Sequence, residues 1–257
     1  MSGIDVERSA AGIVTLWLNN PGRLNALSNR MVAGLVAEMT ALAADASCRA
    51  VVLRGRQGAF CAGRDLNDLA ALQSAPPEEI ERMYDLMEGM NRAIYFCPKP
   101  VVSVVERFAL GIGTMIVGWT DIAIAEETAK LGFPEVRHGI VPYGAAPSLL
   151  KLMRSRDVAD LLLSGRTFLA PEAMRLGLVN RVVPAGRLEE ELGETLTGIL
   201  AGKPGALEET KRFIRHSEEL GYEDGIALAT KNAKAKTGNA ELKDGLGAYT
   251  ERGKRPS

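Results

Sequence analysis

The stretch that most constrains this fold is residues 106–142, ERFALGIGTMIVGWTDIAIAEETAKLGFPEVRHGIVP. An apolar run at residues 101–105 precedes it and predicts a buried strand. Gly111, Ile112 and Gly113 then open an apolar segment that we interpret as a helix. Such a helix would direct unpaired N–H groups and its positive dipole end at whatever lies in front of it. We therefore expect a place here that stabilises developing negative charge.

A single acid, Glu135, follows Pro134 in the same stretch and has mostly apolar neighbours. It is either a charge in the first turn of a helix or a catalytic base. His138 lies three residues later, on the same face of a helix, where it would contact Glu135 or substrate or form part of a pocket wall.

The composition indicates an ordinary globular protein. The chain has 257 residues, a formal net charge of −1 and three cysteines without metal-ligand spacing. This balance gives no electrostatic footprint for nucleic acid, and we expect no metal site. The N-terminus does not resemble a signal peptide, and no apolar run is long enough to span a membrane. We therefore expect a cytoplasmic enzyme in a reducing compartment.

Strand–turn–helix units recur through about residue 185, which predicts an α/β fold. From residue 188 onward the pattern is helical only, with four helices expected over residues 188–200, 204–216, 222–236 and 240–251. The predicted domains are thus an α/β core over residues 1–187 and a helical region over residues 188–257.

Two glycine-containing motifs carry the chemistry. Residues 58–66 place small residues before a helix, which is typical either of half an oxyanion hole or of a plain loop with Asp65 as the first acid of the helix. The Gly111–Ile112–Gly113 run is not a dinucleotide fingerprint, because the third glycine would fall at Ile116. We expect no nucleotide redox cofactor.

The ordered set of motifs resembles the crotonase family, also called the enoyl-CoA hydratase/isomerase family. The similarity covers nearly the whole chain, through residues 19–27 (NNPGRLNAL), 59–66 (AFCAGRDL), 99–102 (KPVV), 109–113 (ALGIG), 121–125 (DIAIA), 131–142 (LGFPEVRHGIVP), 170–173 (APEA) and 177–180 (GLVN).

The resemblance implies a spiral of repeated ββα units, a C-terminal helical oligomerisation region, and homotrimers that pair into hexamers. It implies an acyl-CoA thioester as substrate, in fatty acid metabolism, with no further cofactor. It assigns the oxyanion hole to the backbone N–H groups of Arg64 and Ile112, and acid/base chemistry to Glu135. A cation from the tail, Arg252, would reach a CoA phosphate. The substrate-binding positions that follow are Arg23, Leu24, Ala26, Ala62, Asp65, Leu66, Leu110, Met115, Pro134, His138 and Tyr143.

Two positions depart from the family's hydratase pattern. Hydratases of the family carry two catalytic glutamates, and the first of them falls at Met115, which cannot move a proton. The loop after Pro142 also has fewer glycines than is usual, and it contains Tyr143. Isomerisation of a 3-enoyl-CoA to a 2-enoyl-CoA needs only one base, so Glu135 alone favours isomerisation over hydration. Hydration with one glutamate, acyl-CoA hydrolysis or decarboxylation, and a non-catalytic acyl-CoA-binding scaffold remain the alternatives.

Overall fold

The main sheet forms the centre of the larger part of the chain. The computed structural model describes residues 3–252, apart from the side chains of residue 245 and residues 248–252. Six strands follow the order β1-β2-β3-β4-β6-β9. β1 is antiparallel to β2, and all other neighbouring pairs are parallel. The six strands span Gly3–Arg8, Ile13–Asn19, Ala50–Gly55, Val101–Val105, Ile122–Glu126 and Arg181–Val183.

A second sheet of three short strands accompanies the first. Its order is β5-β7-β8, with the strands at Phe108–Leu110, Lys130–Gly132 and Thr167–Leu169. β4 is followed directly by β5 and then by helix α4 at Ile112–Trp119, and β6 is followed by β7 and then by a 3₁₀ turn, η3, at Pro134–His138. The chain therefore repeats a strand–strand–helix unit, as the predicted ββα spiral requires.

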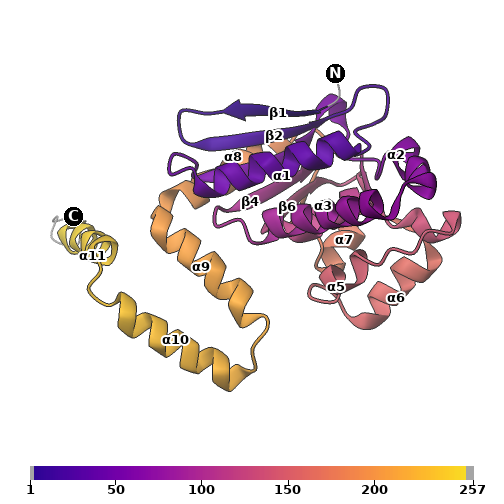
Figure 1. Cartoon of the computed structure of the whole chain (residues 1–257). Helices are drawn as coiled ribbons and strands as arrows, with labels where there is room; N and C mark the ends of the chain where they lie inside the picture. The colour runs from indigo at the N-terminus through magenta and orange to yellow at the C-terminus, as the bar shows by residue number, and fades with distance from the viewer. Residues whose placement is uncertain (1–2, 253–257) are drawn as a thin grey trace. The chain divides into compact units, whose positions relative to one another are not determined.

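Helices cover both faces of the main sheet because its central strands are apolar on both sides. Along β4, Val101 and Val105 belong to one core cluster, whereas Val102 and Val104 belong to another. The first cluster includes α1 (Asn29–Ala44) and α3 (Pro77–Tyr95), which lie side by side in Figure 1. The second includes α8 (Leu188–Ala201). This alternation follows from the two-residue period of a strand.

Local signals explain where the helices begin. Ser28 caps α1, with its hydroxyl accepting from Met31 N–H at 3.3 Å, and Asp65 caps α2 by accepting from Asn67 N–H at 2.9 Å. The shorter helical elements of this part of the chain are α2 (Leu66–Ala71), α5 (Ala145–Leu149), α6 (Ser155–Ser164), α7 (Ala170–Leu176) and the 3₁₀ turns η1 (Arg56–Gly58) and η2 (Leu72–Ser74).

The chain divides after Leu200 into two compact units. The second contains α9 (Pro204–Ser217), α10 (Tyr222–Lys236) and α11 (Ala240–Arg252). The sequence predicted a boundary after residue 187, but Leu188, Leu192 and Leu196 of α8 pack against the sheet and attach that helix to the first unit. The side chain of Arg252, expected near a CoA phosphate, lies outside the described residues.

Within residues 3–252, no helix is long and apolar enough to cross a membrane.

Candidate active site

The loop that leads to Arg64 lies against the end of β5. Leu110 N–H donates to Cys61 O at 2.9 Å, and Cys61 N–H donates to Phe108 O at 3.2 Å. A Cβ on Gly113 would lie 2.8 Å from Cys61 Cβ, so the close approach requires a glycine. These contacts hold the segment that carries Arg64 beside the first turn of α4.

The two N–H groups predicted to form an oxyanion hole are not used by the backbone hydrogen bonds around them. Arg64 forms an isolated parallel bridge with Leu27, whose bonds run from Leu27 N–H to Gly63 O at 2.7 Å and from Asp65 N–H to Leu27 O at 2.9 Å. Neither bond uses the N–H of Arg64. Ile112 is the first residue of α4, where an N–H group has no partner within the helix.

The carboxyl of Glu135 lies directly against Gly111, the residue before α4. Gly111 has φ 53° and ψ −119°, a conformation that suits only glycine, and a Cβ there would lie 2.5 Å from Glu135 Oε1. Glu135 Oε2 is buried and has no hydrogen-bond partner among the described residues. Burial raises the pKa of Glu135, and a bond from its own backbone N–H opposes that rise. A partly desolvated carboxyl with one unpaired oxygen, lying against the glycine that precedes α4, has the environment of a group that transfers protons.

A buried hydroxyl ties the helix start to the segment that leads to Glu135. Thr114 Oγ1 lies 2.6 Å from Ala109 O and 3.0 Å from Gly132 O, and it accepts from Gly132 N–H at 3.2 Å. Gly111 N–H also donates to Gly132 O at 2.8 Å. The sequence did not single out Thr114 for this role, although a polar residue inside an apolar helix was a visible signal.

The remaining predicted residues on this side of the site differ in exposure. Met115 is half-buried, and its Cε would lie 2.7 Å from a Cβ on Gly144. The terminal methyl group of Met115 therefore packs against the loop that follows Pro142. Pro134 is half-buried, whereas His138 is exposed at the end of η3 and Tyr143 is 80% exposed. The structure therefore gathers Met115 with the loop at Gly144 but leaves His138 and Tyr143 at the surface.

The residues predicted to contact CoA are also brought together. Ala62 N–H donates to Leu24 O at 3.1 Å, and Arg23 forms a 3.4 Å ion pair with Asp65. Asp65 is buried, but Leu24 is 49% exposed and Leu66 is 70% exposed. Two apolar side chains thus face solvent next to a cation, which suits a ligand with apolar and anionic parts.

Asn25 supports this surface from below, a role that sequence reasoning missed. Asn25 has φ 58° and is buried, and its amide nitrogen donates to Arg56 O at 2.8 Å and Ala59 O at 2.7 Å. Its Oδ1 accepts from Asn20 N–H, and Asn20 in turn donates to Ala26 O. These bonds offset the cost of a left-handed backbone and fix two loops relative to each other.

The side chain of Arg64 is a further feature that the sequence did not predict. It is half-buried, and its two terminal nitrogens donate to Asn29 Oδ1 at 2.7 Å and to Met87 Sδ at 3.3 Å. Burial lowers the pKa of the guanidinium, an effect that Asp68, Tyr84 and Asp65 oppose. The charge is therefore held between the start of α1 and the middle of α3.

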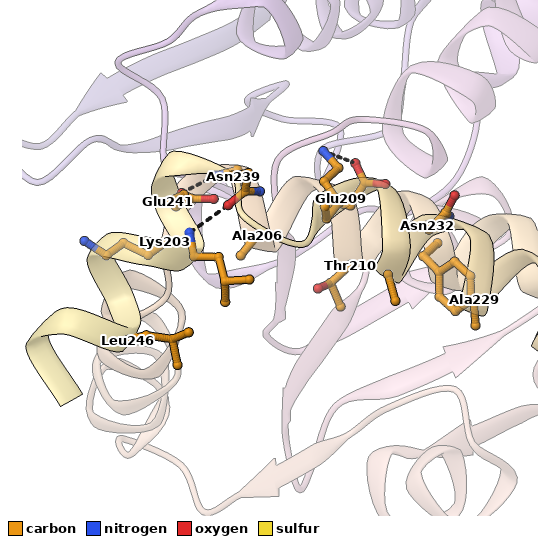
Figure 2. A pocket seen from close by; sticks show the side chains of 14 residues that line it. Lys203, Ala206, Glu209, Thr210, Ala229, Asn232, Asn239, Glu241 and Leu246 are labelled. Carbon is orange, nitrogen blue, oxygen red and sulfur yellow. Dashed lines mark hydrogen bonds and ion pairs between the residues drawn. The ribbon is translucent and has the colours of Figure 1, made fainter. Parts of the chain in front are cut away.

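A groove of about 620 Å³ lies within the second unit, among α9, α10 and α11 (Figure 2). Ala206, Ala229 and Leu246 belong to its lining, and Glu209 forms a 3.4 Å ion pair with Lys236 at its edge. None of the residues predicted to bind or convert substrate lines it.

Comparison with known proteins identifies the family. The enoyl-CoA hydratase/isomerase family model matches residues 8–256. This chain belongs to the enoyl-CoA hydratase/isomerase family. Enoyl-CoA hydratase EchA19 of Mycobacterium tuberculosis is 31% identical over 255 residues, covering 96% of this chain and 93% of that protein. An enoyl-CoA hydratase structure from Mycobacterium smegmatis has a TM-score of 0.91 at 30% identity, covering 99% of this chain and 98% of that one. Pseudomonas aeruginosa AtuE has the same TM-score at 32% identity, covering 97% of this chain and 96% of that one.

Membership of the enoyl-CoA hydratase/isomerase family confirms the predicted fold and shows that the chain is an enzyme of the lyase or isomerase type that acts on acyl-CoA. Hydratase names dominate among its relatives.

Proposed function

We propose that this enzyme moves the double bond of a 3-enoyl-CoA to the 2-position, with Glu135 as its single acid and base. The observation that carries the proposal is the Glu135 carboxyl against Gly111, with one oxygen buried and unpaired. The thioester oxygen would accept from the backbone N–H groups of Arg64 and Ile112. CoA would lie along the surface formed by Arg23 and Leu24, with no other cofactor.

The reaction balances without water. Glu135 takes a proton from Cα, and the electron pair moves to the thioester oxygen as an enolate forms. The two N–H donors stabilise that charge more than the neutral ground state, each by about 3 kcal/mol. When the enolate collapses, the double bond forms between Cα and Cβ, and the electron pair of the former Cβ–Cγ double bond takes the proton from Glu135 at Cγ. General acid–base catalysis of this kind contributes about 10²–10⁴ in rate.

Met115 supports isomerisation over hydration. A second carboxylate would share the work of adding a hydroxyl at Cβ and a proton at Cα. Met115 instead packs a thioether methyl against the loop at Gly144 and offers no proton acceptor.

The second candidate is hydration of a 2-enoyl-CoA by Glu135 alone. The hydratase names of the relatives favour it. Hydrolysis or decarboxylation of an acyl-CoA would need a different reacting group at the same N–H donors, and the names of the relatives give no support for either.

Deuterium transfer distinguishes these reactions. A 3-enoyl-CoA and a 2-enoyl-CoA are each incubated in D₂O, and products are identified by NMR and mass. We expect a 2-enoyl-CoA product with deuterium at Cγ, and at Cα only as the reaction reverses, with little hydroxyacyl-CoA. Glu135→Gln should lower turnover by about 10²–10⁴ while leaving acyl-CoA affinity nearly intact. Met115→Glu should raise hydration relative to isomerisation. If Glu135→Gln isomerises as fast as the parent, the base lies elsewhere.

We also propose that the protein forms homotrimers or hexamers in the cytoplasm, with the helices after residue 188 in the contact. Exposed apolar side chains on α9 and α10, Ile214 and Ile226, support this. Sedimentation at micromolar concentration tests it, and a monomer would exclude it.

A further inference from the structure

The guanidinium of Arg64 is a half-buried charge without an acidic partner among the described residues. Within residues 3–252, no Asp or Glu oxygen lies within ion-pair distance of it, and its bonds go to the neutral Asn29 and Met87. A guanidinium has five N–H donors, and two bonds leave the others open. Burying a charge without a counter-ion is costly, so such a group gains from a ligand that brings one.

The neighbouring carboxylates are engaged elsewhere. Asp68 Oδ2 accepts from the backbone N–H of Asn29 at 2.5 Å, at the start of α1. Asp65 caps α2 through Asn67 and pairs with Arg23. Both therefore oppose the lowering of the Arg64 pKa only from a distance. The charge remains available to a substrate.

The position of Arg64 in the chain links this charge to the substrate. In the proposed function, on which this inference rests, the thioester oxygen accepts from the backbone N–H of the same residue. The acyl chain would then begin beside Arg64, whose guanidinium lies between α1 and α3. Met87 supplies an apolar wall there, which suits the methylene groups between the thioester and a second polar group.

We propose that Arg64 binds a carboxylate on the acyl chain, so that the preferred substrates are CoA thioesters of dicarboxylic acids. Arginine matches a carboxylate with two parallel N–H donors, a geometry that a methyl end cannot use. Position 64 thus has two roles: its backbone binds the thioester oxygen, and its side chain selects the acyl group.

The test measures binding of saturated acyl-CoAs, which require no turnover. Calorimetry compares succinyl-, glutaryl- and adipyl-CoA with butyryl-, pentanoyl- and hexanoyl-CoA, so that each pair differs only in its terminal group. We expect at least one diacid thioester to bind about 10- to 100-fold more tightly than its matched partner. Arg64→Met should reduce that ratio to about one, and Arg64→Lys should leave an intermediate preference.

Two further variants separate recognition from folding. Asn29→Asp places a carboxylate where Asn29 Oδ1 now accepts from Arg64 at 2.7 Å, so the charge becomes paired internally and the preference should fall several-fold. Arg30→Met removes an exposed charge at the residue after Asn29, and this variant should keep the preference for diacid thioesters. Circular dichroism checks that each variant is folded.

Equal binding at every chain length, or an undiminished preference in Arg64→Met, would overturn the proposal. Because these ligands do not react, a diacid preference without isomerisation would refute the proposed reaction and leave this inference standing. Isomerisation without a diacid preference would refute this inference and leave the proposed reaction standing.

Discussion

The buried hydroxyl of Thr114 offers the sharpest test of how the candidate site is held together. It contacts β5 through Ala109 O and β7 through both backbone groups of Gly132, and it is completely buried. Thr114→Val keeps the branched shape but replaces the hydroxyl by a methyl group. The change therefore removes the polar link between the start of α4 and the segment that leads to Glu135.

The size of the effect follows from these contacts. Leaving a buried polar group without its partner costs about 1–3 kcal/mol. Gly132 O keeps its bond from Gly111 N–H, and Ala109 O and Gly132 N–H belong to the parallel pairing of β5 with β7, so the cost should lie at the lower end of that range. For a protein of this size, about 1 kcal/mol corresponds to a fall in Tm of about 2–4 °C. If the Glu135 segment shifts relative to Gly111, kcat should fall by about 10- to 100-fold with little change in KM.

Thr120→Val is the matched control, because Thr120 lies at the opposite end of the same helix. Its hydroxyl is also buried and bonds Val117 O at 2.8 Å and Ser103 Oγ at 2.9 Å. We expect a similar fall in Tm in thermal scans but no selective loss of kcat in the isomerisation assay. If the two variants lose stability equally and Thr114→Val retains full turnover, the link does not position the base, and the reasoning is wrong.

Two further predictions concern Glu135 and Asn25. Because burial raises the pKa of Glu135, its ionisation disfavours the folded state as pH rises through that raised pKa. Glu135→Gln should therefore raise Tm by a few degrees at pH 7, and thermal scans below pH 4.5 should show that gain shrinking; a constant difference across pH would contradict this. Asn25→Gly keeps the left-handed backbone but removes the three side-chain bonds, so it should cost about 1–3 kcal/mol and weaken acyl-CoA binding by calorimetry. Unchanged affinity would show that the loops at Ala59 and Asn20 need no such support.

Elements with strong local signals were predicted well from the sequence. The helix expected at the Gly111–Ile112–Gly113 run and the bounds of α10 at residues 222–236 agree with the structure, and Glu135, for which the first turn of a helix was one of two interpretations, lies in a 3₁₀ turn. Each has a proline, a glycine or a clear helical period near its end. The strand prediction at residues 101–105 also holds, because an apolar run of that length specifies a buried strand.

The elements that were missed depend on contacts that are distant in the chain. β5, β7 and β8 have three residues each, too few to show a period, and they exist because they pair with one another. β1 was also missed, since it is an edge strand whose sequence, GIDVER, mixes charge and apolar residues.

In the candidate site too, residues with local sequence signals were predicted, whereas contacts between distant segments were not. Sequence motifs and family resemblance pointed to Arg64, Ile112 and Glu135, and the structure places Glu135 against the glycine before Ile112. Their catalytic roles stay predictions. The links through Thr114 and Asn25 and the surroundings of the Arg64 side chain could not be predicted, because each joins segments that only folding brings together.

The contact between Glu135 and Gly111 has a consequence for anyone who randomises this site. The base occupies the volume that a side chain at position 111 would need, and the backbone there already excludes most residues. Two independent effects therefore exclude other residues at position 111: the backbone conformation and the collision with the carboxyl of Glu135. Shortening the acid at position 135 removes only the collision. A library that varies both positions together would therefore recover glycine at 111 whatever acid it selects at 135, so useful diversity has to come from positions such as Met115 and Arg64.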